Sequence, residues 1–573
     1  MSKFILGIWD GHDSGAALLR GSEILCAVNE ERLTRRKLEI TFPRRSIEAC
    51  LKQASLLPSD INTIAISTTD PAKTLTRLFP SLKEEYYLIR RRKKSPRPLD
   101  PLRKAFKYLF TELPPNRLST GLSRNYLNRQ LQSLGFADFE LCLIDHHDAH
   151  AAAAACLCGF PEALVVTLDG VGDGLCGSAR IWRDGRSELL QKFPANASPG
   201  IFFEHVTNLL NMRELEDEGK VMAQANYAYP VPDAENPLLD VISSRDGRIV
   251  SAHSATAQLK QLKKILWKYP SEQFSFMAQR ALEKTACDLV QHYLQKTGMR
   301  NIAAAGGVFS NIKMNMALAA LPETERIYVF PHMGDGGLAI GAAMAANQEL
   351  CGITHYDLTN LYLGPAFTPQ DIHSALEGEK GIRIIQGENA QQKAVELILK
   401  GEVILWFSGR MEIGPRSLGN RSILARPDDR TIKDRLNLIL KKRVWYQPFC
   451  PSILAEDAAA LLELSGQEIA DNPFMTMAYR VRNEHRQVME GVINIDGTCR
   501  PQFVRDENPA FRNLLLGIKK ELGFGVLLNT SFNIHGEPLV CSPAEAVKMM
   551  KQSGIGYLFM EDVIIENQNA ARL

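Results

Sequence analysis

One order of strands and turns occurs twice in the first third of the chain, and it restricts the fold more than any other feature. Residues 4–9 (FILGIW) form an apolar run, a turn of small residues follows, and the chain returns as a hairpin about Arg20 and Gly21. After Asp169 a glycine-rich turn, a strand, a turn at Asp184-Gly185 and another strand repeat this order. The repetition predicts an α/β fold in which one topology is used twice.

Domains of the acetate kinase, hexokinase and actin-like class begin with such a hairpin. Their first turn binds phosphate through backbone N–H groups and small polar side chains, because small residues let the backbone approach an anion closely. Ser14 and Gly15 lie in this turn. His12 in the same loop is a candidate general base, and a surface histidine in a polar turn is the alternative.

An alanine-rich helix between two apolar strands carries a second candidate site. We expect strands at residues 139–144 and 163–168, and a helix that begins near Asp145. His146 and His150 are four positions apart, so they lie on one face of this helix, where a metal can bind both. The alternative is a chance pair of histidines, with Asp145 serving only as an N-cap.

Two aspartates complete a ligand set. Asp169 follows the strand 163–168, and Asp335 lies in a turn between a strand and a helix N-terminus. Because strand ends of an α/β domain meet at one edge, we expect two histidines and two aspartates to converge there. The residue after His146 is His147, which excludes the HExxH metalloprotease pattern. Imidazole with carboxylate allows Zn, Mn or Fe.

Length, charge and cysteines narrow the class of protein. With 573 residues the chain exceeds one core, and we expect domains at 1–355 and 356–573, with a helical insert at about 70–135. The net charge of +2, from 67 basic and 65 acidic residues, argues against nucleic acid and membrane partners. Scattered cysteines and no signal peptide predict a cytoplasmic protein, and no apolar run is long enough to span a bilayer.

Two basic runs in the first domain have competing interpretations. Residues 35–37 (RRK) lie where a strand passes into a helix and can reach a phosphate, while residues 90–94 (RRRKK) can meet an anionic acceptor. For both runs we favour the simpler interpretation of solvated charge.

The second domain contains three stretches with anion-binding chemistry. They carry Arg416 and Arg421 in a glycine-rich segment, the pair Lys441-x-Arg443, and Ser531 with Asn533 at a polar strand end. Arginine binds phosphate oxygens bidentately, and the set supplies at least two cations, a hydroxyl and an amide. Individually, surface charge or an ordinary turn explains each stretch. Together they predict a site for one small anion.

Motifs follow one another along nearly the whole chain: GHDSGAAL, EERLTRRK, FPRRSI, DHHDAHAAAA, VVTLDGVGDG, EGKVM, AAGGVFSN, FPHMGDGGLAIGAA, GRMEIGPRSLGNRSIL, KxR and LLNTSFN. In order and spacing the chain resembles the NodU/CmcH family of O-carbamoyltransferases, which includes tobramycin, geldanamycin and cephalosporin carbamoyltransferases. The resemblance implies an α/β fold with an N-terminal actin-like (ASKHA, TsaD-like) domain of two RNase H-like halves and a C-terminal YrdC-like α/β domain.

The resemblance also implies roles for single residues. It places Fe(II) on His146, His150, Asp169 and Asp335, and the active-site histidine on His12. It places carbamoyl phosphate on Arg416, Lys441, Arg443, Ser531 and Asn533, and the nucleotide on Lys37, Gly306, Gly307 and Asn311. The chain departs from the family pattern at Ala223, Asn226, Ala228, Val444 and Gln447.

The implied activity has two steps. ATP, with Mg, and carbamoyl phosphate give carbamoyl adenylate, and the carbamoyl group then passes to a hydroxyl of a small molecule such as a natural product or sugar. A homodimer is one oligomeric state to test. A tRNA threonylcarbamoyladenosine-type enzyme needs a basic face that the balanced charge does not support, and an actin-like small-molecule kinase needs neither the metal set nor a second anion site. We expect acceptor contacts from residues 70–135 and 228–275.

Overall fold

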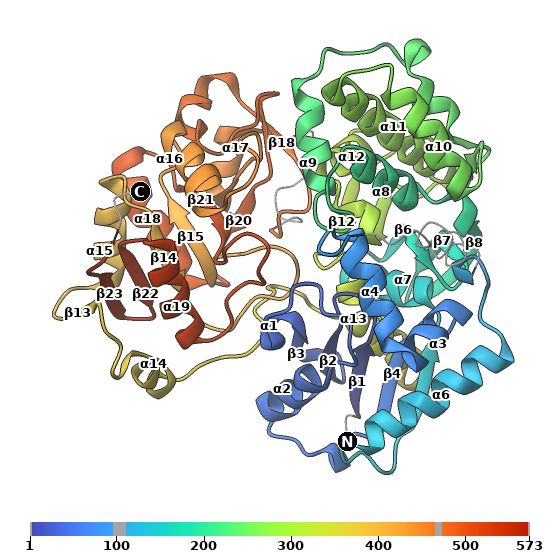
Figure 1. The fold of residues 1–573 in the computed structure, drawn as a ribbon, viewed down its shortest axis with the longest axis horizontal. Helices are drawn as coiled ribbons and strands as arrows, with labels where there is room; N and C mark the ends of the chain where they lie inside the picture. The colour runs from blue at the N-terminus through green and yellow to red at the C-terminus, as the bar shows by residue number, and fades with distance from the viewer. Residues whose placement is uncertain (1–2, 96–109, 465–472, 571–573) are drawn as a thin grey trace. The chain divides into compact units, whose positions relative to one another are not determined.

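The computed structural model describes residues 3–95, 110–464 and 473–570, and it divides the chain into two compact units (Figure 1). The first unit consists of Met1–Leu25 and Ile40–Asp357, and the second of Cys26–Glu39 and Leu358–Leu573. We keep 1–355 and 356–573 as proposed domains. Nothing in the sequence indicated that Cys26–Glu39 group with the second unit.

The two five-stranded sheets of the first unit share one topology. Their strand orders are β3-β2-β1-β4-β5 and β8-β7-β6-β11-β12. In each sheet the first strand pairs antiparallel with the second and parallel with the fourth, which pairs parallel with the fifth. This is the RNase H-like order, so the predicted α/β fold with two such halves is confirmed. The strands are β1 (Phe4–Trp9), β2 (Gly15–Arg20), β3 (Glu23–Asn29), β4 (Thr63–Ser67), β5 (Glu140–Ile144), β6 (Glu162–Gly172), β7 (Leu175–Arg183), β8 (Arg186–Pro194), β11 (Asn301–Ala305) and β12 (Arg326–Val329).

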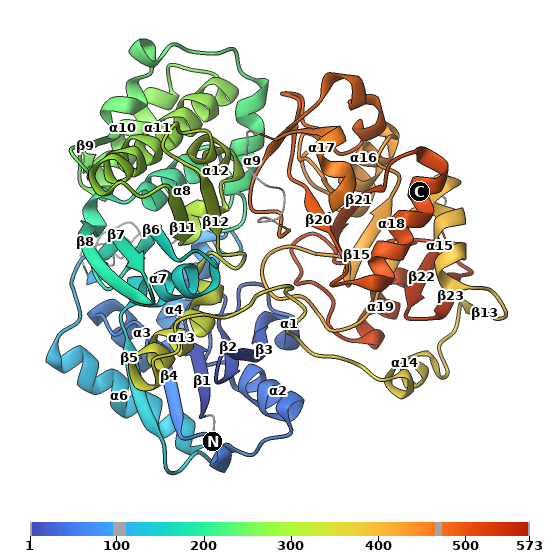
Figure 2. The ribbon, with the colours of Figure 1, turned by 180° about the vertical axis from the view of Figure 1, so that it is seen from behind.

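Two alanine-rich helices, α7 (His146–Leu157) and α13 (Leu338–Cys351), pack against each other between the sheets, as Figures 1 and 2 show from opposite sides. Helix α13 also packs on β1 and β4 of the first sheet, and α7 packs on β6 and β11 of the second. A Cβ at Gly341 would lie 2.0 Å from the carbonyl oxygen of Ala149. Small residues therefore set the close approach of α7, which carries His146 and His150, and α13, which begins just after Asp335.

Strand β6 (Glu162–Gly172) is longer than the predicted strand 163–168. It continues through Asp169, and its register with β7 shifts between Leu168 and Gly172. The prediction that Asp169 follows the end of the strand is therefore wrong. The bulge adds residues without ending the strand, and it re-aims the side chain.

Helices and a small hairpin complete the first unit. The described part of residues 70–135 is helical, while residues 96–109 lie outside the described residues. No helix among the described residues has the length and apolar character needed to cross a bilayer. The remaining elements are α2 (Arg44–Ala54), α3 (Pro71–Leu78), α4 (Pro80–Arg90), α6 (Arg117–Gln132), α8 (Pro199–Leu209), α9 (Glu218–Gln224), β9 (Ile242–Arg245), β10 (Arg248–Ser251), α10 (Ala255–Leu266), α11 (Ser271–Thr297) and α12 (Ile312–Ala319).

The second unit is built on an eight-stranded mixed sheet with the order β13-β23-β22-β14-β15-β21-β16-β20. Helices α15 and α18 lie side by side and bury apolar residues with strands of this sheet (Figure 2). This is the α/β domain expected after the first. Its elements are α1 (Glu31–Thr34), α14 (Pro369–Leu376), β13 (Ile382–Ile385), α15 (Ala390–Leu399), β14 (Ile404–Phe407), β15 (Arg421–Ala425), α16 (Arg430–Arg435), β16 (Cys450–Leu454), α17 (Ala458–Leu461), β17 (Leu462–Glu463), β18 (Tyr479–Val481), β19 (Thr498–Cys499), β20 (Gln502–Val504), α18 (Pro509–Leu522), β21 (Val526–Ser531), α19 (Pro543–Ser553), β22 (Tyr557–Met560) and β23 (Val563–Asn567).

The segment Cys26–Glu39 is held within the second unit by side-chain hydrogen bonds. Arg32 Nη2 donates to the carbonyl of Gly414 at 2.8 Å. Arg35 donates from Nη1 to the carbonyl of Leu539 at 2.6 Å and from Nη2 to that of Pro538 at 2.8 Å. The favoured interpretation of residues 35–37 as solvated charge is therefore wrong for Arg35.

Candidate functional site

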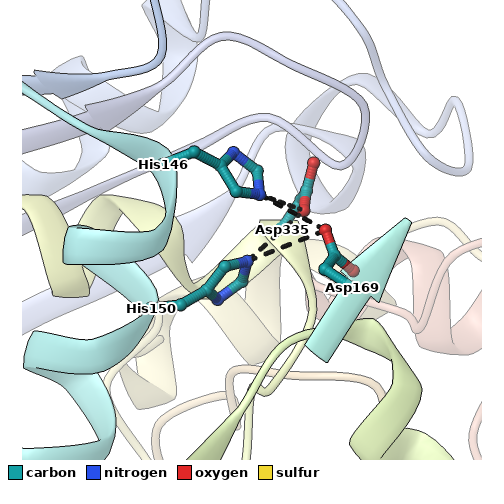
Figure 3. A group of neighbouring side chains, drawn as sticks. All are labelled: His146, His150, Asp169 and Asp335. Atoms are coloured by element: carbon teal, nitrogen blue, oxygen red, sulfur yellow. Dashed lines mark hydrogen bonds and ion pairs between the residues drawn. The ribbon is translucent and has the colours of Figure 1, made fainter. Parts of the chain in front are cut away.

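Four side chains from three elements of the first unit converge (Figure 3). His146 and His150 lie one turn apart on α7, Asp169 lies on β6, and Asp335 begins the short 3₁₀ turn before α13. His146 Nε2 is 3.3 Å from Asp169 Oδ2 and 3.6 Å from Asp335 Oδ1. His150 Nε2 is 3.9 Å and 3.7 Å from the same two oxygens. One ligand atom from each residue lies within 4.8 Å of the others, and we call this set the His–Asp cluster.

Neighbouring residues fix the ring of His146. Asp145 occupies the N-cap position of α7, but within the described residues its side chain forms no capping bond. Asp173 Oδ2 instead accepts from the His146 backbone N–H at 2.8 Å, so Asp145 holds the N-cap position of the alternative interpretation without capping through its side chain. His146 Nδ1 lies 3.0 Å from Thr68 Oγ1, and a Cβ at Gly172 would lie 2.2 Å from the ring. With Nδ1 engaged, Nε2 is presented to the two carboxylates.

The predicted nucleotide residues Gly306 and Gly307 lie beside Asp169. The Gly307 N–H donates to Asp169 Oδ1 at 2.8 Å, which leaves Oδ2 directed at the histidines. Gly306 has φ +106, and a Cβ there would lie 2.1 Å from the carbonyl oxygen of Leu168. Only glycine fits this close approach, so the pair positions a carboxylate of the His–Asp cluster.

The electrostatics of the His–Asp cluster fit a divalent cation. Burial favours neutral Asp169, but the hydrogen bond with His146 and the charge of His150 outweigh it and hold its pKa well below the usual value. Burial and the charge of Asp169 raise the pKa of Asp335 well above its usual value. Burial lowers the pKa of His150, whose Nε2 has no hydrogen-bond partner among the described residues. Two imidazoles and two close carboxylates form a donor set that suits Zn, Mn or Fe.

His12 lies next to this cluster. Its Nδ1 is 3.4 Å from Asp335 Oδ2 and 3.3 Å from the hydroxyl of Tyr87, and its carbonyl accepts from Trp9 Nε1 at 2.8 Å. Its side chain is 25% exposed, so it can exchange a proton with a bound molecule. The first-turn histidine and the His–Asp cluster therefore lie side by side in the first unit.

A cavity of about 1150 Å³ opens beside the His–Asp cluster within the first unit. His12, His146 and Asp335 contribute to its lining, together with residues of α3, α4 and α10. These helices belong to the two stretches, 70–135 and 228–275, from which acceptor contacts are expected. The sequence did not indicate that α8 and the loop after it also line the cavity.

The basic run at residues 90–94 is largely engaged within the first unit. Arg90 is buried and pairs with Glu204 and Glu214, and Arg91 is buried and pairs with Glu216. The favoured interpretation of this run as a solvated loop is therefore wrong for Arg90 and Arg91. The paired acids lie more than a hundred positions further along the chain, so no local sequence pattern links them to Arg90 and Arg91.

In the second unit, Lys441, Ser531 and Asn533 lie together. Lys441 Nζ donates to the carbonyl of Ser531 at 2.5 Å and to the carbonyl and Oδ1 of Asn533, both at 2.9 Å. Ser531 Oγ donates to Asn533 Oδ1 at 2.7 Å. Burial and the charges of Arg443 and Lys37 lower the pKa of Lys441 well below its usual value. Among the described residues, the hydrogen-bond partners of Lys441 Nζ are therefore all neutral oxygens.

Three arginines act on the same region electrostatically. Burial and the charge of Arg500 lower the pKa of Arg416 to about 9, and burial is also the main cause that lowers the pKa of Arg443 to about 10. Arg500 donates to Cys450 Sγ at 3.1 Å and 2.9 Å, and Arg443 lies 4.5 Å from the ring centre of Phe449. We call Arg416, Lys441, Arg443 and Arg500 the cation cluster.

The cation cluster lacks compensating charge. No carboxylate among the described residues forms an ion pair with its members, and Arg416 Nε and Arg443 Nη2 are buried without hydrogen-bond partners there. Buried cations of this kind are compensated by a polyanion such as phosphate. Sequence reasoning missed Arg500, which belongs to no motif; the pairing of β20 with β16 carries it to Cys450.

Other predicted residues have local partners. Arg421 donates to the carbonyls of Ser408, Gly409 and Asn420 and lies 3.5 Å from the ring centre of Phe407, so it is a structural arginine.

The predicted nucleotide set is divided between the units. Lys37 belongs to the second unit, where its charge acts on Lys441. Asn311 belongs to the first unit, where it caps α12 by accepting from the Met314 N–H at 3.1 Å and exchanges hydrogen bonds with Gln279. The four residues Lys37, Gly306, Gly307 and Asn311 are therefore not gathered within one unit.

Comparisons with known proteins identify the family. The Carbamoyltransferase N-terminus family model matches residues 4–344, and the Carbamoyltransferase C-terminus model matches residues 395–567. The nodulation protein NolNO of Sinorhizobium fredii is 33% identical over 98% of this chain and 80% of its own length. The 3'-hydroxymethylcephem-O-carbamoyltransferase of Amycolatopsis lactamdurans is 27% identical over 66% of this chain and 72% of its own length.

A solved structure, the (R)-2-hydroxyglutaryl-CoA dehydratase component A of Acidaminococcus fermentans, matches with 15% identity and a TM-score of 0.34 over 61% of this chain and 99% of that chain. The two family models follow one another along the chain, and the NolNO match spans nearly all of it. The chain therefore belongs to the carbamoyltransferase family.

Proposed function

We propose that the protein is an ATP-dependent O-carbamoyltransferase that forms carbamoyl adenylate from carbamoyl phosphate and passes the carbamoyl group to a hydroxyl of a small molecule. One observation carries the proposal: each unit has its own charged centre, and the two centres differ in chemistry. The cation cluster suits phosphates, and the His–Asp cluster with His12 suits transfer to a hydroxyl.

The first step uses the second unit. Carbamoyl phosphate, ATP with Mg, and water give carbamoyl adenylate, pyrophosphate and phosphate. Both substrates are polyanions. Their phosphate oxygens can pair with the buried cations of the cation cluster, and this pairing offsets the cost of burying those charges without partners. Ser531 Oγ and Lys441 Nζ lie 3.4 Å apart, so one oxygen of an anion can reach both.

The second step uses the first unit. The acceptor oxygen attacks the carbonyl carbon of carbamoyl adenylate, a new C–O bond forms, and the bond between that carbon and the AMP oxygen breaks. His12 takes the acceptor proton at a ring nitrogen, and Tyr87 and Asp335 orient its ring. A divalent cation held by His146, His150, Asp169 and Asp335, Fe(II) as the family resemblance implies, supplies Lewis-acid stabilisation of developing negative charge.

Pyrophosphate release tests the proposal without any acceptor. The purified chain is incubated with ATP and Mg, with and without carbamoyl phosphate, and pyrophosphate and ADP are measured. We expect pyrophosphate only when carbamoyl phosphate is present. Release of ADP upon adding a sugar would identify a kinase instead, and pyrophosphate independent of carbamoyl phosphate would contradict the first step.

A further inference from the structure

The lining of the cavity beside the His–Asp cluster divides into three parts. Its reactive end holds His12, His146 and Asp335. A second part is an apolar wall, in which two leucines are well exposed: Leu75 is 42% and Leu82 is 49% exposed. We define the apolar wall as Leu75, Leu82, Ile89, Val171 and Leu259. Exposed leucines gathered in a cavity indicate that an apolar body is bound there.

Exposed cations form the third part, which we call the basic rim: Arg92, Lys93, Lys94 and Lys260. Arg92 donates to Asn211 Oδ1 and to the carbonyls of Asn208 and Met212, all of which are neutral. Lys94 pairs with Glu85. The other acids of the lining, Asp70, Glu214 and Asp335, are buried, so the entrance carries net positive charge.

The wall is preformed. Helix α4 carries Leu82 and Ile89, and its last residue, Arg90, is paired with Glu204 of α8 and with Glu214. These buried ion pairs hold α4 in place whether or not the cavity is filled. The volume, about 1150 Å³, is slightly above the usual range of roughly 300–1000 Å³ for small-molecule sites. The cavity therefore suits a large acceptor.

We propose that the acceptor is an anionic amphiphile, with its hydroxyl beside His12, its apolar body on the apolar wall and its anionic group at the basic rim. This inference rests on the proposed function, because it assigns the substrate class of the same transfer. The same charges disfavour polycationic acceptors, since like charges at an entrance repel them.

Binding of two matched probes tests the acceptor class. The probes are ω-hydroxydodecanoate and ω-aminododecanol, which share chain length and a terminal hydroxyl and differ in the charge at the other end. Isothermal titration calorimetry on the full chain needs neither ATP nor carbamoyl phosphate. We expect the carboxylate probe to bind at least about tenfold more tightly. Equal binding of the two probes, or binding of neither, would overturn the inference.

Single substitutions test which residues cause the preference for the carboxylate probe. Lys260→Glu should reduce the preference for the carboxylate probe by about fivefold, as expected for an exposed charge. Lys263→Glu makes the same change on the same helix outside the cavity lining and should leave the preference unchanged. Leu259→Gln should weaken both probes alike. A Lys263→Glu effect as large as that of Lys260→Glu would place the probe elsewhere and overturn the assignment.

The proposed function and the acceptor class can be refuted independently. Selective binding together with absence of carbamoyl-phosphate-dependent pyrophosphate release would refute the proposed function while the ligand class stands. Pyrophosphate release of the expected kind together with unselective binding would refute the acceptor class alone. Where both assays succeed, mass spectrometry of ω-hydroxydodecanoate after reaction should show the carbamate ester.

Discussion

The His–Asp cluster and the cation cluster are both buried, yet they solve the problem of buried charge in different ways. In the His–Asp cluster, imidazoles face carboxylates, and neighbouring groups shift each other's pKa. The pKa of Asp169 is held well below its usual value, and the pKa of Asp335 is raised well above its usual value. In the second, like charges are held by carbonyls, a thiol and an aromatic ring, with no acid among the described residues to pair them. The donor set of the first suits a small cation, and the charge of the second suits an anion, as proposed above.

This difference determines how ion binding at each centre should depend on pH. We expect a cation to compete with protons for the His–Asp cluster, whereas an anion should favour the protonated form of Lys441. The predictions below separate the two centres, starting with the largest expected effect.

His146→Ala should remove bound metal and slow carbamoyl transfer by about a thousandfold or more, because it deletes a ligand and unbalances two carboxylates. Pyrophosphate release should survive, since the cation cluster belongs to the other unit. Metal content is measured by elemental analysis. As a control, His147→Gln changes the adjacent buried histidine, which bonds to Thr167 and the Leu175 carbonyl, and should keep the metal. Wild-type metal content in His146→Ala would disprove the ligand set.

Lys441→Ala should lower carbamoyl-phosphate-dependent pyrophosphate release by about thirtyfold or more, since losing one cation of a buried phosphate site costs roughly 2–5 kcal/mol. Metal content should not change. Lys442→Ala removes an exposed charge next in the chain and serves as the control. Chemically supplied carbamoyl adenylate should restore transfer in Lys441→Ala; if it does not, the two steps are not separable.

Gly172→Ala tests whether the His146 ring is held as tightly as the structure indicates. The added Cβ would lie 2.2 Å from the ring, so the ring must turn away from the carboxylates. We expect metal affinity to fall about 10- to 100-fold, as when an orienting partner is lost. Gly219→Ala adds a Cβ with no atom within 4 Å and should have no effect. Unchanged affinity in Gly172→Ala would show that the ring adapts.

The two centres should respond to pH with opposite sign, by up to about tenfold per pH unit for each proton exchanged. The pKa of Asp335 is raised by burial and by Asp169, so rising pH removes a proton that competes with metal, and metal affinity increases. The pKa of Lys441 is lowered by burial, so rising pH removes a charge that binds phosphate, and phosphate affinity decreases. Calorimetry with each ligand measures both. In Lys441→Arg the phosphate slope should flatten, and slopes of one sign for both ligands would contradict the comparison.

The fold of the first unit was predictable because it depends on local signals. The hairpin turn at Gly21 and its repetition later in the chain are short-range patterns, and they led to the confirmed RNase H-like halves. The spacing of His146 and His150 likewise follows from helix geometry alone. Their convergence with Asp335 follows from the rule that strand ends meet at one edge, whereas Asp169 reaches the same point from a bulge within β6.

The remaining features depend on long-range partners that one sequence does not reveal. The Asp173 carboxylate caps α7 from across a bulge, and Arg500 reaches Cys450 through the pairing of two distant strands. Arg90 has two acidic partners more than a hundred residues away. In each case the neighbouring sequence showed only an ordinary charged side chain. The tertiary structure determines the partner of that side chain.

The membership of Cys26–Glu39 in the second unit has a consequence for synthesis on the ribosome. Arg32 and Arg35 emerge early, but the carbonyls of Gly414 and Leu539 that accept their hydrogen bonds are made near the end. At about 5–20 residues per second, translation of the intervening Ile40–Asp357 alone takes roughly 15 s to a minute. During that interval the first unit can fold around a basic segment whose docking partners do not yet exist. A transcript truncated just before the codon for Pro538 therefore leaves Arg35 without its two carbonyl acceptors, while the acceptor of Arg32 is still made.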